Sequence, residues 1–324
     1  MYSPNQLREI VKTGLEELSY PTSPSGLYDP IRYMLALGGK RMRPVLVLMG
    51  CDLFDGEINK ALKPALAIEV FHNFTLLHDD IMDNAPLRRA KATVHEKWNT
   101  NIAILSGDTM FVQSCRLMMQ APQPVLTKVM DIFTQTAIEV CEGQQIDMDF
   151  EKAGNVSIDD YLKMIRLKTA VLLGASLEIG GLIGGANESD AKHLYDFGVN
   201  LGLAFQLQDD ILDVYGDAET FGKQVGGDII ADKKTYLLLT ALQQAAGKDK
   251  EELRSWIQQP VLDGEAKVFA IKGMYEKLNV RAQAEEKMQS LYQEAMTHLD
   301  AIPLADDRKK PLKLLAEELM VRVV

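Results

Sequence analysis

Two copies of one five-residue pattern, Asp-Asp-x-x-Asp, begin 130 residues apart in this chain, at residues 79–83 and 209–213. Each copy follows a long apolar segment of the kind that forms a buried helix. Residues at positions i and i+4 of a helix lie about 5–6 Å apart, so each pattern gathers carboxylates on one side of a helix. Two carboxylates about 5 Å apart repel by roughly 3 kcal/mol at an effective dielectric constant near 20. The fold must therefore bring cations to both patterns.

The donor atoms of the two patterns favour a hard cation. They offer oxygen ligands without Cys or a Cys/His pair, which indicates Mg²⁺. An EF-hand is excluded because its ligands alternate along a loop with Gly at position six and Glu at position twelve. Mg²⁺ usually completes its coordination shell with water and substrate phosphates. The patterns therefore predict a magnesium-assisted phosphate site.

Basic residues stand where phosphate groups could be bound. Lys40 and Arg43 follow a glycine pair, and Arg88 and Arg89 come one to two turns after Asp83. Arg matches phosphate geometry with two hydrogen bonds, whereas Lys supplies a point charge. Taken with the Asp patterns, these cations predict two phosphate sites, one with metal and one without. Three more cations stand where a second polyanion could be held, namely Lys168, Lys223 and Lys233.

Two histidines near the first pattern have competing interpretations. His72 lies seven residues before Asp79, about 10 Å along the same helix face, and could bind substrate or fill the core. His78 and Asp79 together resemble the metal pair of HD-type phosphohydrolases, but that class needs further His and Asp ligands. The chain has five His in all. No nucleophile constellation, GxxxxGK[ST] or GxGxxG is present, so we expect cation-driven chemistry on a diphosphate.

Helical periodicity dominates the chain and strand alternation is nearly absent, which predicts an all-α fold. No linker-like stretch divides the sequence, so we expect one domain over residues 1–324. Expected helices cover about 5–18, 28–37, 43–53, 59–84, 92–120, 124–150, 158–184, 189–215, 234–246, 249–258, 263–279, 281–299 and 309–321.

Composition and charge exclude several other classes. The net charge of −11 argues against nucleic acid as a partner. Three widely spaced Cys build neither a disulfide framework nor a zinc site, so a reducing, cytoplasmic location is expected. The sequence contains no run of eighteen apolar residues, so no membrane-spanning helix is predicted. The N-terminus lacks a signal-peptide pattern.

Several motifs together resemble the trans-isoprenyl diphosphate (polyprenyl) synthase family, with the short-chain farnesyl and geranylgeranyl diphosphate synthases as the nearest type. They cover residues 38–235 in the family's order. The matching segments are Gly38-Gly39-Lys40-Arg41-Met42-Arg43-Pro44, His72, His78 to Asp83, Arg88-Arg89, Lys168-Thr169, Phe205-Gln206, Asp209 to Asp213, Gly222-Lys223 and Asp228 to Lys233.

This resemblance implies an isoprenoid synthase-type helical bundle around a central cavity, usually a homodimer. It further implies head-to-tail (1'-4) condensation of isopentenyl diphosphate with dimethylallyl, geranyl or farnesyl diphosphate. The resemblance also implies which residues bind each group. Three Mg²⁺ are bound by Asp79, Asp83 and Asp209, supported by Asp80 and Asp213. The allylic diphosphate is bound by Arg88, Lys168, Lys223 and Lys233, and isopentenyl diphosphate is bound by Lys40, Arg43, His72 and Arg89; the allylic cation is faced by Gln144, Thr169 and Gln206.

Product length is expected to depend on residues before the first pattern. The resemblance implies that a bulky aromatic at Phe74 blocks the growing chain and favours fifteen or twenty carbons. Helix geometry places Thr75 directly beneath Asp79 and Phe74 on the flank, and Phe71 is another plausible floor. Phe74 could also be an ordinary core aromatic.

The chain departs from the family pattern at a few positions. Ala90 and Ala92 stand where the family commonly has Gly and Pro, and Asp232-Lys233-Lys234 leaves open which lysine contacts the diphosphate. The alternatives are a medium- or long-chain polyprenyl diphosphate synthase, a non-catalytic subunit of a heteromeric synthase, and a class I terpene cyclase. A cyclase normally replaces the second pattern, and a non-catalytic subunit tends to lose one, whereas this chain keeps both.

Overall fold

The computed structural model describes residues 1–216, 226–258 and 263–320. Helices make up about four-fifths of this part, with two strands of two residues each, which confirms the predicted all-α fold. The helices are α1 (Pro4–Glu16), α2 (Ser25–Ala36), α3 (Met42–Leu53), α4 (Ile58–Met82), α5 (Val94–Lys97), α6 (Thr100–Met118), α7 (Leu126–Lys152), α8 (Ile158–Ile165), the π-helical segment η1 (Arg166–Ala170), α9 (Val171–Gly184), α10 (Glu188–Tyr215), α12 (Gly227–Ile230), α13 (Tyr236–Gln244), α14 (Gly247–Gln258), α15 (Gly264–Lys277), α16 (Val280–Ala301) and α17 (Asp306–Met320).

The prediction of one helix over 92–120 is wrong at its beginning. The chain there forms a hairpin of two short strands, β1 (Leu87–Arg88) and β2 (Lys91–Ala92), and then the short helix α5. Asn99 adopts an extended backbone, and its side chain accepts a hydrogen bond from Ile102 N at 2.9 Å. Because Asn99 caps α6 in this way, the longer helix cannot continue backward through it.

The described chain forms two compact units. Unit 1 contains residues 1–135, 175–195 and 304–311, and unit 2 contains residues 136–174, 196–303 and 312–324. Four of the five unit boundaries fall inside α7, α9, α10 and α17, and the fifth falls between Pro303 and Leu304. The expectation of one domain over residues 1–324 stays a prediction.

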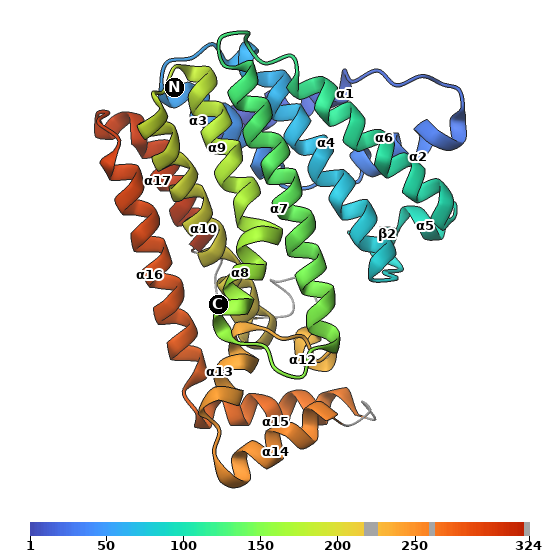
Figure 1. The fold of residues 1–324 in the computed structure, drawn as a ribbon, viewed down its shortest axis with the longest axis vertical. Coiled ribbons are helices and arrows are strands. Elements are labelled where there is room, and N and C mark those ends of the chain that lie inside the picture. The colour runs from blue at the N-terminus through green and yellow to red at the C-terminus, as the bar shows by residue number, and fades with distance from the viewer. Residues whose placement is uncertain (217–225, 259–262, 321–324) are drawn as a thin grey trace. The chain divides into compact units, whose positions relative to one another are not determined.

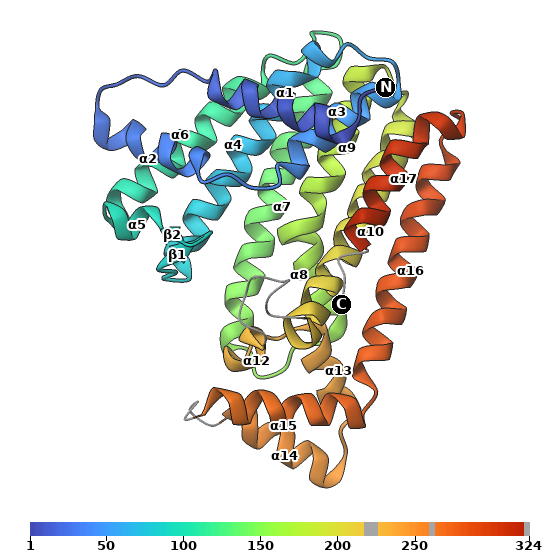
Figure 2. The ribbon, with the colours of Figure 1, turned by 180° about the vertical axis from the view of Figure 1, so that it is seen from behind.

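Unit 1 is built around α4. This helix packs against α1, α2, α3 and α6, and it runs beside α6 in both views of the ribbon (Figures 1 and 2). The α3 helix contacts the end of α9 through glycines: a Cβ on Gly50 would lie 2.6 Å from Leu177 O, and one on Gly180 would lie 2.0 Å from Val47 O. Only glycine permits so close a backbone approach.

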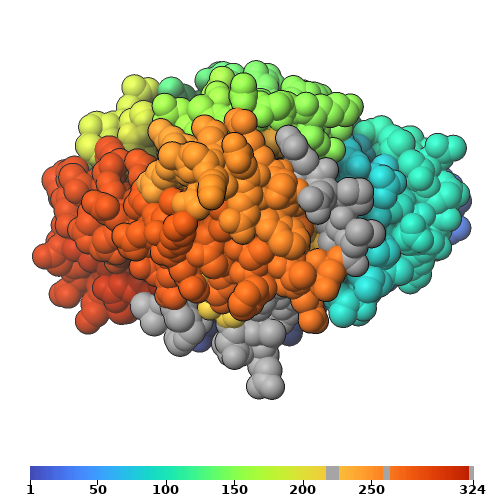
Figure 3. All heavy atoms as spheres, turned by 90° about the horizontal axis from the view of Figure 1, so that it is seen from below, coloured from blue at the N-terminus to red at the C-terminus, as the bar shows by residue number. Residues whose placement is uncertain are grey.

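Unit 2 packs short helices around α13 and α15. The α13 helix contacts α8, α15 and α16, while α12 and α14 pack against α15. Seen from below, the residues of α14 and α15 form the orange outer surface of this unit (Figure 3). Lys267 of α15 is buried and pairs with Asp232 at 2.7 Å, which ties α15 to the segment before α13.

One stretch of the described chain, Ile158–Gly184, is long and apolar enough to cross a membrane, although the sequence predicted no such segment. Of its most apolar window, 72% lies inside the protein. An apolar helix that is mostly buried is the arrangement of a core helix.

Candidate active site

The first Asp pattern lies at the C-terminal end of α4. Asp79 is half-buried, Asp80 is 1% exposed, and Asp83 is an exposed residue just after the helix. The Asp83 N–H still bonds to Asp79 O at 2.9 Å, so the last helical turn is closed. Asp79 and Asp83 therefore keep the i, i+4 relation that the sequence predicted, while Asp80 turns toward the protein interior.

Arg88 neutralises the inward side of this pattern. Its Nε donates to Asp80 Oδ1 at 2.7 Å, and its Nη2 lies 3.7 Å from Asp79 Oδ2. Arg88 reaches this position because the β1–β2 hairpin folds back after α4. The hairpin turn has two consecutive positive φ angles, 53° at Arg89 and 60° at Ala90, which is the geometry of a tight two-residue hairpin.

Arg89 and the glycine pair fit against each other. Arg89 Nη1 donates to Gly38 O, and a Cβ on Gly39 would lie 2.7 Å from Arg89 Nη2. Gly39 also has a φ of 128°, a conformation that L side chains rarely adopt. The predicted basic segment at residues 40–43 is thus joined to the hairpin that carries Arg88, and Lys40 follows as an exposed side chain.

His72 is held as a neutral ring by Arg43. The Arg43 Nη1 and His72 Nε2 atoms are 3.1 Å apart, and an arginine can only donate. Nε2 must then be the acceptor, which leaves the ring proton on Nδ1. Burial first, and then the positive charge of Arg43 and three other arginines, lower the pKa of His72 well below its usual 6.5. Burial likewise lowers the pKa of Arg43.

A buried ion pair, which the sequence did not reveal, shapes the basic segment. Arg41 has a left-handed backbone with a φ of 49°, and its Nη1 lies 2.5 Å from Glu69 Oε1. Its Nη2 also donates to Leu35 O at 2.5 Å. Asn73 Nδ2 donates to the same Glu69 oxygen at 2.9 Å. Since Glu69 is 2% exposed, a charge inside an apolar run was the available signal, because a buried carboxylate needs a partner.

An aromatic cluster lies below the first pattern and contains two of the three residues predicted to set product length. Phe71 is 1% exposed, and its ring centroid lies 5.7 Å from Phe74 and 5.4 Å from Phe133. Phe74 also contacts Phe111 at 5.4 Å and His78 at 4.8 Å. The third residue, Thr75, is half-buried and its hydroxyl donates to His72 O at 2.8 Å, within its own helix.

The second Asp pattern, on α10, is more deeply buried than the first. Asp210 is 4% exposed and Asp213 is 9% exposed, whereas Asp209 is half-buried. Asp210 Oδ2 accepts from the Tyr161 hydroxyl at 2.5 Å and from Tyr236 N at 3.2 Å. Burial raises the pKa of Asp210 to about 7 in spite of these bonds.

Asp213 connects the second pattern to α12. Its Oδ2 accepts from Asp228 N at 3.0 Å, and its backbone oxygen accepts from Gly226 N at 2.6 Å. Asp228 in turn lies 3.2 Å from Lys233 Nζ. The next lysine, Lys234, instead lines a separate cavity of unit 2, so Lys233 is the one that extends toward the second pattern. Lys223 lies outside the described residues.

The π-helical segment η1 carries Lys168 and Thr169 and lies directly against two helices. A Cβ on Gly143 of α7 would lie 2.2 Å from Lys168 N, and one on Gly202 of α10 would lie 2.9 Å from Ala170 Cα. The wider turn is closed by Val171 N–H bonding to Arg166 O, five residues back. Such segments often occur at functional sites.

Three further side chains join η1 from these neighbouring helices. Lys168 Nζ pairs with Asp147 Oδ2 at 2.6 Å, a contact that the sequence did not reveal. Gln144 directly follows Gly143, and Gln206 lies one helical turn after Gly202. Unit 2 thus brings together Lys168, Thr169, Gln144 and Gln206 near the start of the second pattern.

The donor set of the two patterns fits a hard cation. Asp80 Oδ2 is buried with no hydrogen-bond donor among the described residues, and burial raises the pKa of Asp80 although Arg88 opposes the shift. Within the described ranges, no three Asp, Glu, His or Cys side chains are placed to hold one ion by themselves. This fits Mg²⁺, which typically takes one or two carboxylates together with water and substrate phosphates.

Comparison with known proteins gives a consistent result. The family model described as polyprenyl synthetase matches residues 24–274. The geranylgeranyl diphosphate synthase of Sulfolobus acidocaldarius is 43% identical over 229 residues, which cover 69% of each chain. A crystal structure of a geranylgeranyl pyrophosphate synthase matches 100% of both chains with 42% identity and a TM-score of 0.95.

A third similar protein was solved with bound ligands. The polyprenyl synthase of Caulobacter crescentus, in complex with calcium and isoprenyl diphosphate, is 27% identical to this chain with a TM-score of 0.83. The match covers 98% of this chain and 94% of that one.

Proposed function

This chain belongs to the polyprenyl synthetase family, and we propose that it condenses isopentenyl diphosphate head to tail with an allylic diphosphate. It is a trans-prenyltransferase that makes a short-chain prenyl diphosphate. The names of its relatives support a product of twenty carbons. The proposed product is all-trans, and the proposed starter is dimethylallyl, geranyl or farnesyl diphosphate.

The observation that carries this proposal is the arrangement of charge in unit 1. Asp79 and Asp83 project from the end of α4, while Arg88 binds the inward Asp80 from the adjacent hairpin. Arg43 contacts neutral His72, and Arg89, in the turn of that hairpin, donates to Gly38 O beside the basic segment. Unit 1 thus carries carboxylates at the end of α4 and a basic segment joined to the adjacent hairpin, which suits one diphosphate bound through metal and one bound directly.

The allylic diphosphate is the leaving group in this proposal. Asp79, Asp83 and Asp209, supported by Asp80 and Asp213, would hold three Mg²⁺, which supply positive charge to the departing diphosphate. The complex of the Caulobacter crescentus relative with calcium and isoprenyl diphosphate supports a divalent-cation role. Arg88, Lys168, Lys223 and Lys233 add fixed positive charge to the same diphosphate.

The carbon chemistry needs no protein nucleophile. Ionisation of the allylic C–O bond leaves a cation, which the carbonyl and hydroxyl oxygens of Gln144, Thr169 and Gln206 stabilise. The double bond of isopentenyl diphosphate attacks that cation and forms the new C–C bond. A proton then leaves the adjacent carbon, and the released diphosphate accepts it.

Isopentenyl diphosphate must be bound without cleavage of its own C–O bond to the diphosphate. Lys40, Arg43 and Arg89 donate hydrogen bonds to its phosphate oxygens without withdrawing charge through a metal. His72, kept neutral, donates through Nδ1–H. A ring that stays neutral adds no charge to a segment that already carries several arginines.

The aromatic cluster below the first Asp pattern limits the product. Phe74 and Phe71 contact each other and the rings of Phe111 and Phe133, so the floor is a packed group rather than one side chain. Thr75 adds the position closest to Asp79. The variant Phe74→Ala is expected to extend the product beyond twenty carbons, as measured by chromatography of the dephosphorylated prenols. An unchanged product would contradict the floor.

We propose that the enzyme is a homodimer that pairs through α6. Leu105, Val112 and Met119 are 59%, 57% and 59% exposed and follow one another at seven-residue intervals, so they form one apolar stripe on the helix and its end. Exposed apolar stripes of this kind mark protein interfaces. Leu105→Lys should shift the protein to monomer in light scattering, and an unchanged mass would contradict this interface.

One experiment tests the central proposal. The protein is incubated with Mg²⁺, isopentenyl diphosphate and each allylic starter in turn, and the chain length of the products is measured. Products of twenty carbons from at least one starter are expected. Release of inorganic phosphate or diphosphate without a longer prenyl product would instead indicate a hydrolase.

A further inference from the structure

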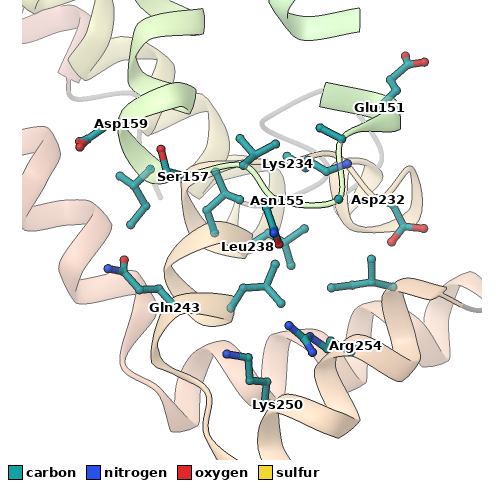
Figure 4. Close-up of a pocket in the computed structure, with 17 residues that line it drawn as sticks. Glu151, Asn155, Ser157, Asp159, Asp232, Lys234, Leu238, Gln243, Lys250 and Arg254 are labelled. Atoms are coloured by element: carbon teal, nitrogen blue, oxygen red, sulfur yellow. The ribbon is translucent and has the colours of Figure 1, made fainter. Parts of the chain in front are cut away.

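Unit 2 contains a cavity that the proposed reaction does not use. It has a volume of about 1060 Å³ and lies between the segment after α7, the start of α13 and the helix α14 (Figure 4). Sites for small organic ligands commonly have volumes of about 300–1,000 Å³. None of its lining residues belongs to the two Asp patterns or to η1.

Three cations line this cavity from two separate segments. Lys250 and Arg254 are one turn apart on α14, so they share one face of that helix. Lys234 comes from the segment before α13. In the close-up, Lys250 and Arg254 point upward from α14 into the space below Asn155, whose side-chain amide also faces it (Figure 4).

The acidic residues at the edge do not cancel these charges inside the cavity. Asp232 is already paired with the buried Lys267 at 2.7 Å. Glu151 and Asp159 direct their carboxylates away from the centre of the cavity (Figure 4). The interior therefore presents more positive than negative charge, which favours an anionic group.

The opposite wall is apolar. Leu238 and Leu239 of α13 are each 5% exposed, and Leu242 continues this row one turn further along the helix. Ile257 completes the wall from α14. A cavity with a cationic end and an aliphatic wall matches a molecule that has a charged head and a hydrocarbon chain.

We propose that this cavity is a second binding site, separate from the reaction centre, for a single-chain amphipathic anion with a phosphate or diphosphate head. Lys250 and Arg254 bind the head through charge-assisted hydrogen bonds. Lys234 directs its amino group away from these two cations (Figure 4). The leucines of α13 and Ile257 cover the chain. The site is concave, so it accepts one chain from solution rather than the flat surface of a membrane.

Calorimetric titration with dodecyl phosphate tests this proposal. The titration is done on the whole protein with EDTA and without isopentenyl diphosphate, below the micelle concentration of the ligand. Wild type is expected to bind, and Lys250→Gln/Arg254→Gln should weaken the binding about tenfold, a change of 1.4 kcal/mol in binding free energy. The matched control, Lys248→Gln/Lys310→Gln, removes two exposed charges that do not line the cavity and should bind as wild type does.

A second variant tests the apolar wall. Leu242→Trp fills the space beside α13 and should weaken the binding of dodecyl phosphate while leaving the weaker binding of inorganic diphosphate unchanged. Equal binding by wild type and the Lys250/Arg254 variant would overturn the proposal. So would inorganic diphosphate binding as tightly as dodecyl phosphate, or binding only to phosphatidic acid vesicles.

Two further titrations distinguish the possible sources of a natural ligand. Geranylgeranyl diphosphate with EDTA represents a product of the proposed reaction type, and farnesyl monophosphate represents a chain with a single phosphate. The binding experiments involve no turnover. A wild-type protein that binds dodecyl phosphate but forms no prenyl product would therefore contradict the proposed function and leave the cavity proposal intact.

Discussion

The two Asp patterns have their three aspartates at the same spacing, but their second aspartates are stabilised differently. In unit 1, Asp80 is bound by a guanidinium, that of Arg88. In unit 2, Asp210 is bound by the neutral Tyr161 hydroxyl and a backbone N–H, and its pKa rises to about 7. The same pattern thus belongs to a charged network in one unit and to a largely neutral one in the other.

The ends of the two patterns differ as well. Asp83 is exposed just after α4, whereas Asp213 is buried and accepts a bond from the backbone of α12. In each pattern, however, the first aspartate is half-buried. The two first aspartates are therefore the most alike, as expected if they serve the substrate in the proposed reaction, whereas the surrounding residues differ with the local fold.

The largest expected effect comes from removing the first aspartate of either pattern. Asp79→Ala and Asp209→Ala should each lower kcat about 10³-fold or more, because each loses charge that stabilises the leaving diphosphate. Steady-state kinetics with farnesyl diphosphate measures this, and circular dichroism shows whether the helices remain. Near-normal turnover in either variant would remove that pattern from the reaction.

The second aspartates should respond unequally to the loss of charge. Asp80→Asn leaves Arg88 without its closest carboxylate and should lower the free energy of unfolding by about 2 kcal/mol. Asp210→Asn keeps an oxygen for Tyr161 and should cost less than about 1 kcal/mol. Urea denaturation of metal-free protein measures both. Equal losses would show that the two networks are equivalent.

The pH dependence of stability tests the charged network of unit 1. The pKa of His72 is well below its usual 6.5 in the folded protein, so the unfolded chain binds a proton that the folded chain does not. Above pH 6.5 this residue does not change the free energy of unfolding as the pH changes. Below pH 6.5, it lowers the free energy of unfolding by up to about 1.4 kcal/mol per pH unit.

The variant His72→Gln removes this contribution. Its free energy of unfolding should fall less steeply than that of wild type between pH 6.5 and 5, as followed by urea denaturation at several pH values. Parallel profiles of the two proteins would mean that the ring is protonated in the folded state.

The last contrast concerns the turns that follow the two patterns. Ala90 has a φ of 60° after the first pattern, and Gly226 has a φ of 80° after the second. Ala90→Gly should raise stability by about 1 kcal/mol, since glycine tolerates this conformation. Gly226→Ala should cost at least as much, because its Cβ would lie 2.6 Å from Val268 Cγ2. Thermal denaturation should show a higher Tm for Ala90→Gly and a lower Tm for Gly226→Ala than for wild type.

Much of the fold could be predicted because helices repeat locally. The predicted helix at 59–84 corresponds to α4, and that at 189–215 corresponds to α10, each within two residues at either end. The break before α6 was missed because Asn99 acts through one capping bond, which does not disturb the apolar period. The apolar periodicity of the sequence therefore predicts the helices, but it does not predict a helix end that depends on a single capping side chain.

The candidate site was predicted less completely because ion pairs join distant parts of the chain. Arg41 and Glu69 are 28 residues apart, and Lys168 and Asp147 are 21 apart. Neither separation has a signature in one sequence. The Asp patterns and the basic residues could be found because their chemistry is concentrated in short segments, whereas their supporting partners could not.

The segment η1 behaves like one extra residue accommodated inside an otherwise regular helix. Its turn closes from Val171 back to Arg166 instead of one residue sooner. Deleting Leu167 would let the helix close in the ordinary way. The residues before and after η1 would keep their relative direction, whereas those inside the wide turn would point in new directions. An insertion or deletion here is therefore a change of direction for Lys168 and Thr169, which no substitution of those side chains could reproduce.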